Sequence, residues 1–321
     1  MDLWNYQSLR SLLDRHGFRF SKSKGQNFLL DRRILEQIAA ASEADRGCGV
    51  LEIGPGAGSL TIELAARAGK VAAVELDRDL LPVLAESVGT LSNVEIIPGD
   101  ALKLDLASLA WEKFGAPPAE EQSGNFTPHV QEPSGALTPI VCANLPYNIT
   151  TPILEKLIET PCYRTITVLL QKEVARRLSA PPGSGEAGAF SLWLQYHMET
   201  RTLFDVPRTC FHPVPNVDSA LLRCVRRKHP PVEAADEAFF FRLIRGAFLL
   251  RRKTLVNSLS AAFPEFSREF IREAVRACAL PENVRGERLT FPEFAALARV
   301  LGERNNREGT NLTKKSQILT E

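Results

Sequence analysis

LEIGPGAGSLT, at residues 51–61, is the most informative segment for the fold of this 321-residue chain. It reads as the end of an apolar strand, then a turn containing Gly54, Gly56 and Gly58, then the start of a helix. Glycine adopts positive φ without steric cost and lets the backbone approach a ligand closely. The spacing G-x-G-x-G fits the dinucleotide fingerprint poorly. Together with Glu52, it favours a ligand with a cationic, amino-acid-like part over a pyrophosphate.

Strand-like and helical segments alternate along the first 230 residues. Such alternation predicts a parallel sheet with helices on both faces. The N-terminal residues Met1–Gly17 are also expected to be helical, because leucines recur there at helical spacing. The expected strands are 49–53, 71–75, 94–98, 140–143 and 166–170, followed by an antiparallel pair at about 201–206 and 218–225, and the expected helices are 31–42, 59–68, 78–88, 151–159 and 190–200.

The pattern becomes helical throughout from Ala234 onward, and His229-Pro230-Pro231 marks the change. We expect a catalytic α/β domain over 1–229, a helical RNA-binding domain over 232–303 and a disordered tail over 304–321. The C-terminal helices are expected at 237–250, 254–262, 267–278 and 292–301. A stretch rich in Pro, Gly and Glu at about 115–138 is expected to be an exposed loop insertion.

Two further strands end in carboxylates that suit a nucleoside. Glu75 follows the glycines by about 20 residues, the position at which an acid hydrogen-bonds ribose hydroxyls. Asp100 ends the next strand and is placed to accept a hydrogen bond from an adenine amino group. Asp77, Asp79 and Asp105 are interpreted instead as solvated turn carboxylates. These residues together predict a site for S-adenosylmethionine.

Asn144-Leu145-Pro146-Tyr147 follows the apolar run 140–143. The Asn144 oxygen and a backbone carbonyl are expected to accept the two N–H bonds of an adenine amino group. Tyr147 then offers a ring on which the base stacks. The alternative for this tetrapeptide is an ordinary Pro-containing turn.

The chain resembles the small-subunit rRNA adenine N6,N6-dimethyltransferases, the KsgA (RsmA) family. The NLPYNIT, FHPVPNVDSA and RRKTLVNSL blocks are shared by few other families. In family order, the matching segments are KGQNFL at 24–29, LEIGPGAGSLT at 51–61, Glu75, GDAL at 99–102, NLPYNIT at 144–150, QKEVARRL at 171–178, FHPVPNVDSALLR at 211–223, RRKTLVNSL at 251–259 and RGERL at 285–289.

The resemblance implies a Rossmann-like class I methyltransferase domain followed by a small all-helical domain. It implies dimethylation, dependent on S-adenosylmethionine, of two adjacent adenosines in the hairpin near the 3′ end of 16S rRNA, within small-subunit biogenesis. It also implies a base flipped between Tyr147 and Phe211. The cofactor-binding residues that it implies are Asn27, Leu29, Gly54, Gly56, Glu75, Asp100 and Asn144.

The net charge of +1 hides an asymmetry. Residues 1–150 carry −6 and residues 151–321 carry +7, as counted from the sequence. Clustered Lys and Arg supply the phosphate contacts that dominate nucleic-acid affinity. The expected RNA-binding residues are Arg223, Arg226, Arg227, Lys228, Arg251, Arg252 and Lys253.

The remaining composition is that of a cytoplasmic enzyme. The six cysteines form no C-x-x-C pair and have no accompanying histidine spacing, so neither a metal site nor a disulfide framework is expected. No apolar run has the length of a signal peptide or a membrane span. We expect a cytoplasmic monomer without metal, acting on small-subunit rRNA or the assembled 30S subunit.

Three alternatives remain open. One is the related large-subunit rRNA methyltransferase family of the macrolide-resistance type. Another is a non-catalytic ribosome-assembly or transcription factor on the same fold, against which the intact glycine turn and acids argue. The third is a DNA adenine methyltransferase, in which the first residue of the tetrapeptide is more often acidic than Asn.

Overall fold

The computed structural model describes residues 2–20, 26–115 and 135–302. Most of the expected insertion at 115–138, and the expected tail at 304–321, lie outside the described residues. The chain divides into two compact units. Unit 1 comprises Met1–Arg176 and His197–Lys228, and unit 2 comprises Arg177–Tyr196 and His229–Glu321. Residues 177–196 therefore group with the C-terminal part. The expected domain division places them in the first domain instead, and that division stays a prediction.

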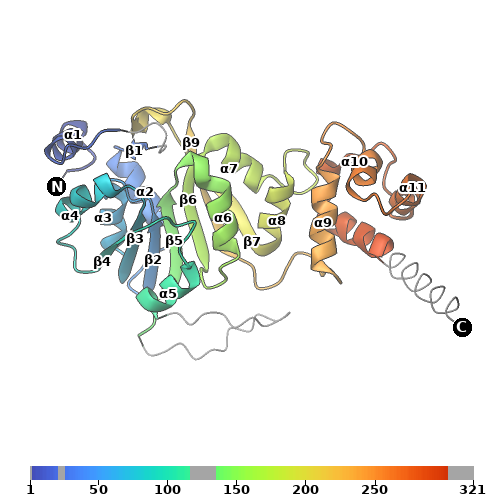
Figure 1. Cartoon of the computed structure of the whole chain (residues 1–321), viewed down its shortest axis with the longest axis horizontal. Helices are drawn as coiled ribbons and strands as arrows, with labels where there is room; N and C mark the ends of the chain where they lie inside the picture. The colour runs from blue at the N-terminus through green and yellow to red at the C-terminus, as the bar shows by residue number, and fades with distance from the viewer. Residues whose placement is uncertain (1, 21–25, 116–134, 303–321) are drawn as a thin grey trace, which may run out of the picture. The chain divides into compact units, whose positions relative to one another are not determined.

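Unit 1 is built on a sheet of seven strands in the order β4-β3-β2-β5-β6-β9-β7 (Figure 1). The first five strands of that order run parallel, while β9 is antiparallel to both β6 and β7. All seven expected strands are confirmed. Their bounds are β2 Cys48–Ile53, β3 Lys70–Glu75, β4 Val94–Pro98, β5 Thr138–Asn144, β6 Thr165–Gln171, β7 Met198–Val206 and β9 Ser219–Arg226.

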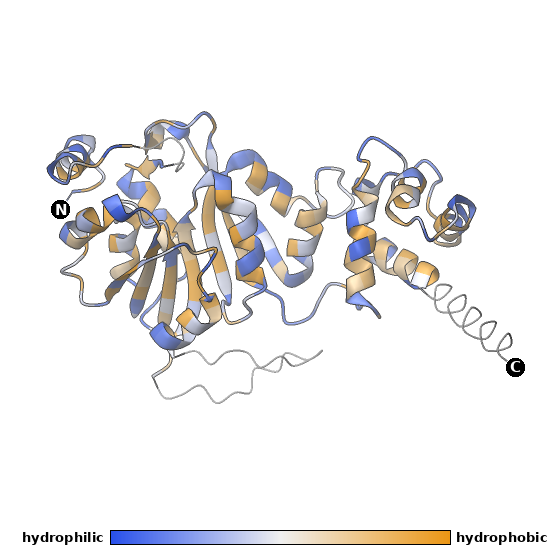
Figure 2. Cartoon of the chain, in the orientation of Figure 1, coloured by the Kyte–Doolittle hydropathy of each residue, from blue (hydrophilic) through white to orange (hydrophobic). Residues whose placement is uncertain are grey.

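The central strands are apolar without alternation because helices cover both faces of a parallel sheet. In β2 and β3 every residue after the first is buried. Figure 2 shows hydrophobic residues along these strands. On one face, side chains of α2 (Arg32–Ala41) and α3 (Ser59–Ala65) pack with Val50, Val71 and Ile140.

The expected helices of unit 1 are present, and the structure adds α5 (Leu106–Phe114) and α7 (Lys172–Ser179). The Asp105 side chain accepts hydrogen bonds from the backbone N–H groups of Ala107 and Ser108, so this acid is the N-cap of α5. Gly115 ends the helix at φ 71°. The remaining helices of this part are α1 Tyr6–Arg15, η2 Arg78–Leu80, α4 Leu81–Ser87, η3 Tyr147–Ile149 and α6 Thr150–Ile158, with α7 Lys172–Ser179 and α8 Ala189–His197 crossing the border of the units.

Unit 2 has a separate apolar core. Phe240, Leu243, Leu259, Phe263 and Phe294 are fully buried in it. The helices are α9 Glu237–Ala247, α10 Leu255–Ala262 and α11 Arg268–Ala277, with a further described helix over 291–302. All four expected C-terminal helices are confirmed.

Candidate active site

A cavity of about 280 Å³ opens at the carboxyl ends of the parallel strands. The strand order reverses between β2 and β5, and open α/β sheets bind ligands at such a switch point. The turn after β2 and the tetrapeptide after β5 both line the cavity. The two sequence motifs, 83 residues apart at their nearest ends, therefore meet in one place.

The glycine turn forms part of one wall of the cavity, and its backbone has φ values that other residue types rarely adopt. Gly54, Gly56 and Gly58 have φ values of 70°, 62° and 91°. A Cβ on Gly58 would also lie 2.7 Å from Cγ1 of Val88. The expected need for glycine at these positions is confirmed by the backbone itself.

Glu75 forms part of the adjacent wall. Its Oε2 accepts a hydrogen bond from the Gly56 N–H at 3.2 Å, and its Oε1 accepts one from the Asp77 N–H at 2.8 Å. Burial raises the pKa of Glu75, and only 6% of the residue is exposed. The two amides hold the carboxylate in place, and each oxygen keeps a lone pair for a ligand hydroxyl.

Glu52 lines the same cavity as a nearly neutral acid. It is 1% exposed, and burial, with the nearby Glu75 charge adding to the effect, raises its pKa to about 8. Its Oε2 is buried without a hydrogen-bond partner among the described residues. A buried oxygen without a partner suits a donor supplied by a ligand.

Asp77 corrects one sequence interpretation. The sequence suggests a solvated turn carboxylate, but Asp77 is 5% exposed and lines the cavity. Its Oδ2 accepts a hydrogen bond of 2.6 Å from Nε2 of Gln26, and its Oδ1 accepts one from the Asp79 N–H. Asp77 thus ties the N-terminal segment to the turn after β3. Its position two residues after Glu75 was the available sequence signal.

Asp100 lies at the rim of the cavity. Its Oδ1 accepts a hydrogen bond from the Leu102 N–H at 3.0 Å, and its Oδ2 lies 3.8 Å from Nζ of Lys103. The side chain is 28% exposed, so the carboxylate remains within reach of a ligand.

The tetrapeptide after β5 presents two oxygen atoms without hydrogen-bond partners. Nδ2 of Asn144 donates to the backbone carbonyl of Asn27 at 3.2 Å, while Oδ1 accepts no hydrogen bond from the described residues. The Pro146 carbonyl accepts from Ile149 N–H and Thr150 Oγ1. The Leu145 carbonyl accepts none from the described residues. The free pair is therefore Asn144 Oδ1 and the Leu145 carbonyl.

Tyr147 is half-buried beside this pair. Its hydroxyl lies 2.7 Å from Oγ of Ser219, which anchors the phenol at the start of β9. Burial raises the pKa of Tyr147, so the side chain is a neutral phenol at physiological pH. The anchored ring lines the cavity.

Phe211 does not line the cavity. Only 2% of the residue is exposed, and it packs in the core with Leu35 and Ile38 of α2. It lies in β8 (Phe211–His212), which pairs with β1 (Phe28–Leu29) and sets Phe211 opposite Leu29. In this structure its ring has no free face for a base, so its stacking role stays a prediction. Asn27 and Leu29, in contrast, both line the cavity.

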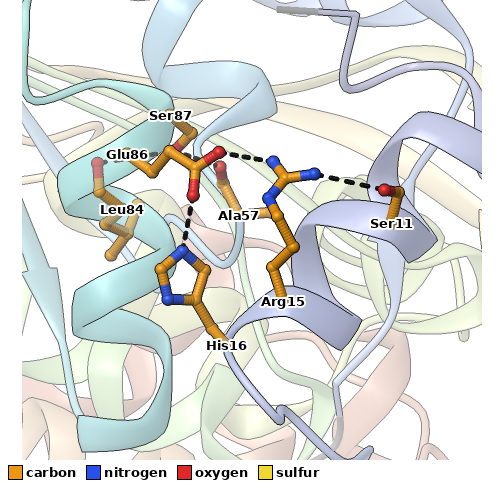
Figure 3. Close-up of polar contacts among 7 residues, drawn as sticks. All are labelled: Ser11, Arg15, His16, Ala57, Leu84, Glu86 and Ser87. Carbon is orange, nitrogen blue, oxygen red and sulfur yellow. Dashed lines mark hydrogen bonds and ion pairs between the residues drawn. The ribbon is translucent and has the colours of Figure 1, made fainter.

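The N-terminal helix is fastened beside the glycine turn (Figure 3). Arg15 forms an ion pair with Glu86, and Nε2 of His16 lies 2.7 Å from Oε2 of the same carboxylate. The next residue, Ser87, donates from Oγ to the Ala57 carbonyl within the glycine turn at 2.8 Å. These contacts join α1 and α4 around the turn that lines the cavity.

The first basic cluster is largely engaged within unit 1. Arg226 is expected on an RNA surface, which stays a prediction, but its guanidinium already has hydrogen-bond partners. That group donates to the carbonyls of Tyr163, Leu157, Ile158 and Thr160 around the end of α6. Burial lowers the pKa of Arg226. Arg223 pairs with Glu43 and Arg227 with Glu199, whereas Lys228 is exposed.

The second basic cluster differs from the first. Arg251, Arg252 and Lys253 are all exposed in the turn between α9 and α10. Within the described part of unit 2, none of the three takes part in an ion pair. Their charges are therefore available to a partner.

No group of three or more His, Cys, Asp or Glu side chains among the described residues is arranged to hold a metal ion. No helix in the described ranges has both the length and the apolar character needed to cross a membrane.

Comparisons with known proteins show the family to which the chain is similar. A family model described as ribosomal RNA adenine dimethylase matches residues 17–289. The "Ribosomal RNA small subunit methyltransferase A" of Geobacillus sp. (strain WCH70) is 43% identical, over 91% of this chain and 95% of its own length. The protein of the same name from Streptococcus pneumoniae serotype 2 is also 43% identical, over 94% and 98%.

Two solved structures match over most of the chain. The 23S rRNA methyltransferase ErmE has a TM-score of 0.63 at 26% identity, covering 86% of this chain and 99% of its own. A dimethyladenosine transferase from Plasmodium falciparum has a TM-score of 0.62 at 22% identity, covering 84% and 95%, and supports the fold alone.

Proposed function

Because this chain belongs to the ribosomal RNA adenine dimethylase family, we propose that it dimethylates the N6 amines of two adjacent adenosines in 16S rRNA. The proposed position is the hairpin near the 3′ end, and the reaction belongs to small-subunit biogenesis. The observation that most supports this chemistry is the pair of unpartnered acceptors, Asn144 Oδ1 and the Leu145 carbonyl, at the cavity.

The residues of the cavity fit S-adenosylmethionine. The buried, unpartnered oxygen of Glu52 suits the amino group of the methionine part, near the glycine turn. The Glu75 carboxylate suits the two ribose hydroxyls, and Asp100 suits the adenine amine. Asn27 and Leu29 would form the opposite wall. When bound, S-adenosylmethionine would supply an electrophilic methyl group.

The tetrapeptide would prepare the target amine. The amine of adenine is a poor nucleophile because its lone pair is delocalised into the ring. Acceptance of both N–H bonds by Asn144 Oδ1 and the Leu145 carbonyl would draw the nitrogen toward sp³ geometry and aim its lone pair. The increase in the methyl-transfer rate would come from the positioning of the amine and from preorganised electrostatics. A neutral Asn also leaves no charge to desolvate when a monomethylated amine returns for its second methyl group.

The target base would have to leave its stack to reach this pair. The ring of Tyr147, anchored by Ser219, offers one face for it. Phe211 would supply the other face only after β8 moves, because its ring is buried. Among the basic residues expected to bind RNA, we propose Lys228 of unit 1 and Arg251, Arg252 and Lys253 of unit 2 as the main phosphate contacts, because all four are exposed. We also propose that the chain acts as a cytoplasmic monomer on the pre-assembled 30S subunit.

A large-subunit substrate is the weaker candidate. The 23S rRNA methyltransferase ErmE is 26% identical, whereas the small-subunit relatives are 43% identical over more of this chain. A non-catalytic role fits poorly with an intact cavity that retains every expected cofactor-binding residue.

One experiment tests the proposal directly. Small subunits isolated without the modification would be incubated with this protein and labelled S-adenosylmethionine, and the methylated nucleotides mapped. We expect two adjacent N6,N6-dimethyladenosines near the 3′ end of 16S rRNA. Label only in 23S rRNA, or no label, would reject the proposed function.

A further inference from the structure

The turn between α9 and α10 presents two leucines to solvent. Leu249 is 57% exposed and Leu250 is 39% exposed. Single exposed apolar residues are ordinary on protein surfaces. These two leucines are consecutive in sequence and directly precede Arg251, Arg252 and Lys253. Together the five residues form an exposed segment that is apolar at one end and cationic at the other.

The backbone of this turn is held rigidly. Leu250 N–H donates to Oγ of Ser258 at 3.0 Å, and the same hydroxyl donates to the Gly246 carbonyl at 2.8 Å. Ser258 is fully buried. Lys253 N–H donates to the Leu250 carbonyl at 2.8 Å. The leucines are therefore held outward by a fixed scaffold and are not the ends of a loose loop.

The close packing beneath the turn supports the same conclusion. A Cβ on Gly246 would lie 2.8 Å from Cε2 of Phe263 and 2.9 Å from Cβ of Ala262. The space beside Gly246 is therefore filled by side chains of α10 and of Phe263. The exposure of Leu249 and Leu250 is set by the packing of α9 against α10 and is not relieved within the described part of unit 2.

We propose that Leu249 and Leu250 form an apolar contact with unstacked nucleobases of the substrate RNA, while Arg251, Arg252 and Lys253 bind the adjacent phosphates. This inference rests on the proposed function and adds to it a contact with the bases. The three adjacent cations favour RNA as the partner, because charge complementarity to phosphates is the dominant attraction. Nucleic-acid-binding proteins combine such cations with apolar wedges such as Leu. Unpaired bases in RNA loops and bulges expose the apolar faces that leucines would cover.

The test uses the full chain and small subunits that lack the modification. The double variant Leu249→Gln/Leu250→Gln removes the apolar surface and keeps every charge. The matched control, Leu249→Met/Leu250→Met, keeps apolar side chains of similar size. Affinity is measured over a salt series, and unpaired 16S rRNA bases are probed chemically in the complexes. Thermal unfolding checks that both variants are folded.

For the Gln variant we expect affinity to fall by about 10-fold, on the scale of two partly buried leucine side chains. The salt slope should match the wild type, because no phosphate contact is lost. One or more bases protected by the wild type should become reactive. The Met variant should bind as the wild type does.

Three results would overturn the inference. Unchanged affinity of the Gln variant would mean that the leucines touch nothing. A loss of affinity together with a reduced salt slope would mean that the basic run was displaced. A loss of affinity with all base protections retained would assign the leucines to a ribosomal protein. Failure of the wild type to methylate the subunits would instead reject the proposed function, so the two failures are distinguishable.

Discussion

Asn144, the last residue of β5, donates a hydrogen bond from Nδ2 to the backbone carbonyl of Asn27, 3.2 Å away and 117 residues earlier in the chain. An amide side chain has an NH2 group with two N–H donors at one end and an acceptor oxygen at the other. Because the Asn27 carbonyl holds the NH2 end, the acceptor oxygen lies at the opposite end of the amide. The N-terminal segment therefore fixes which end of the Asn144 amide is presented at the cavity.

Replacement of Asn144 by alanine should separate chemistry from binding. The variant loses one of the two acceptors for the target amine, and the ring of Tyr147 remains. We expect the methyl-transfer rate at saturating cofactor to fall by about 10²-fold or more, with RNA affinity nearly unchanged. Single-turnover kinetics measure the rate. A wild-type rate would mean that the tetrapeptide is only a turn.

Glu75→Ala should weaken the binding of S-adenosylmethionine by about 1–3 kcal/mol, because two ribose hydroxyls lose a charged acceptor. Calorimetry on the folded variant measures this loss. Asp79→Ala is the matched control, since this exposed carboxylate lies four residues away and outside the cavity. Equal affinities for the Glu75 variant and the wild type would remove Glu75 from the ribose site.

Glu52 should make stability depend on pH. Its pKa is about 8 in the folded chain, above the ordinary 4.5 of an exposed Glu, so between these values the folded state binds more protons than the unfolded state. The free energy of unfolding should therefore fall, by on the order of a few kcal/mol, as pH rises from 4.5 through 8.

The isosteric variant Glu52→Gln should lack this contribution. Urea denaturation of both proteins from pH 5 to pH 9 gives the difference between them as a function of pH. A constant difference across that range would contradict the raised pKa of Glu52.

The triple replacement of Arg251, Arg252 and Lys253 by alanine should reduce RNA affinity at low salt. The logarithmic salt slope should shrink by roughly two to three units as phosphate contacts are lost. Cofactor affinity should not change. A control with the same charge loss is Arg268, Arg272 and Arg276 of α11, whose side chains already contact Asn257, Glu269 and Glu282. Equal slope changes in both variants would indicate an effect of net charge alone.

Arg226→Met should affect folding and not RNA binding. The variant leaves carbonyls near the end of α6 without their guanidinium donor. We expect the free energy of unfolding to fall by about 1–3 kcal/mol, with the salt slope of RNA binding unchanged. Lys228→Met, at an exposed neighbour, should leave stability at its wild-type value. A reduced salt slope in an Arg226 variant of wild-type stability would indicate that Arg226 contacts RNA phosphates.

The local chemistry of the chain was readable from the sequence. Apolar runs predicted all seven strands of the sheet, and helical periodicity predicted α9, α10 and α11. Gly54, Gly56 and Gly58 adopt the positive φ that their residue type permits. These properties depend on neighbours within a few residues, so sequence spacing is sufficient to infer them. The sequence prediction lacks α5 and α7, although Asp105, the N-cap of α5, is a local signal.

The folded arrangement determines which polar side chains already have hydrogen-bond or ion-pair partners and which rings are buried. Arg226 and Arg223 look alike in the sequence, yet one guanidinium is used at the end of α6 and the other in an ion pair with Glu43. Asp77 looks like a turn acid, yet Gln26 draws it into the cavity wall. Phe211 looks like a stacking residue, yet the pairing of β8 with β1 buries it. Each of these outcomes depends on partners distant in sequence, and sequence spacing contains no information about which of them is near enough to bind.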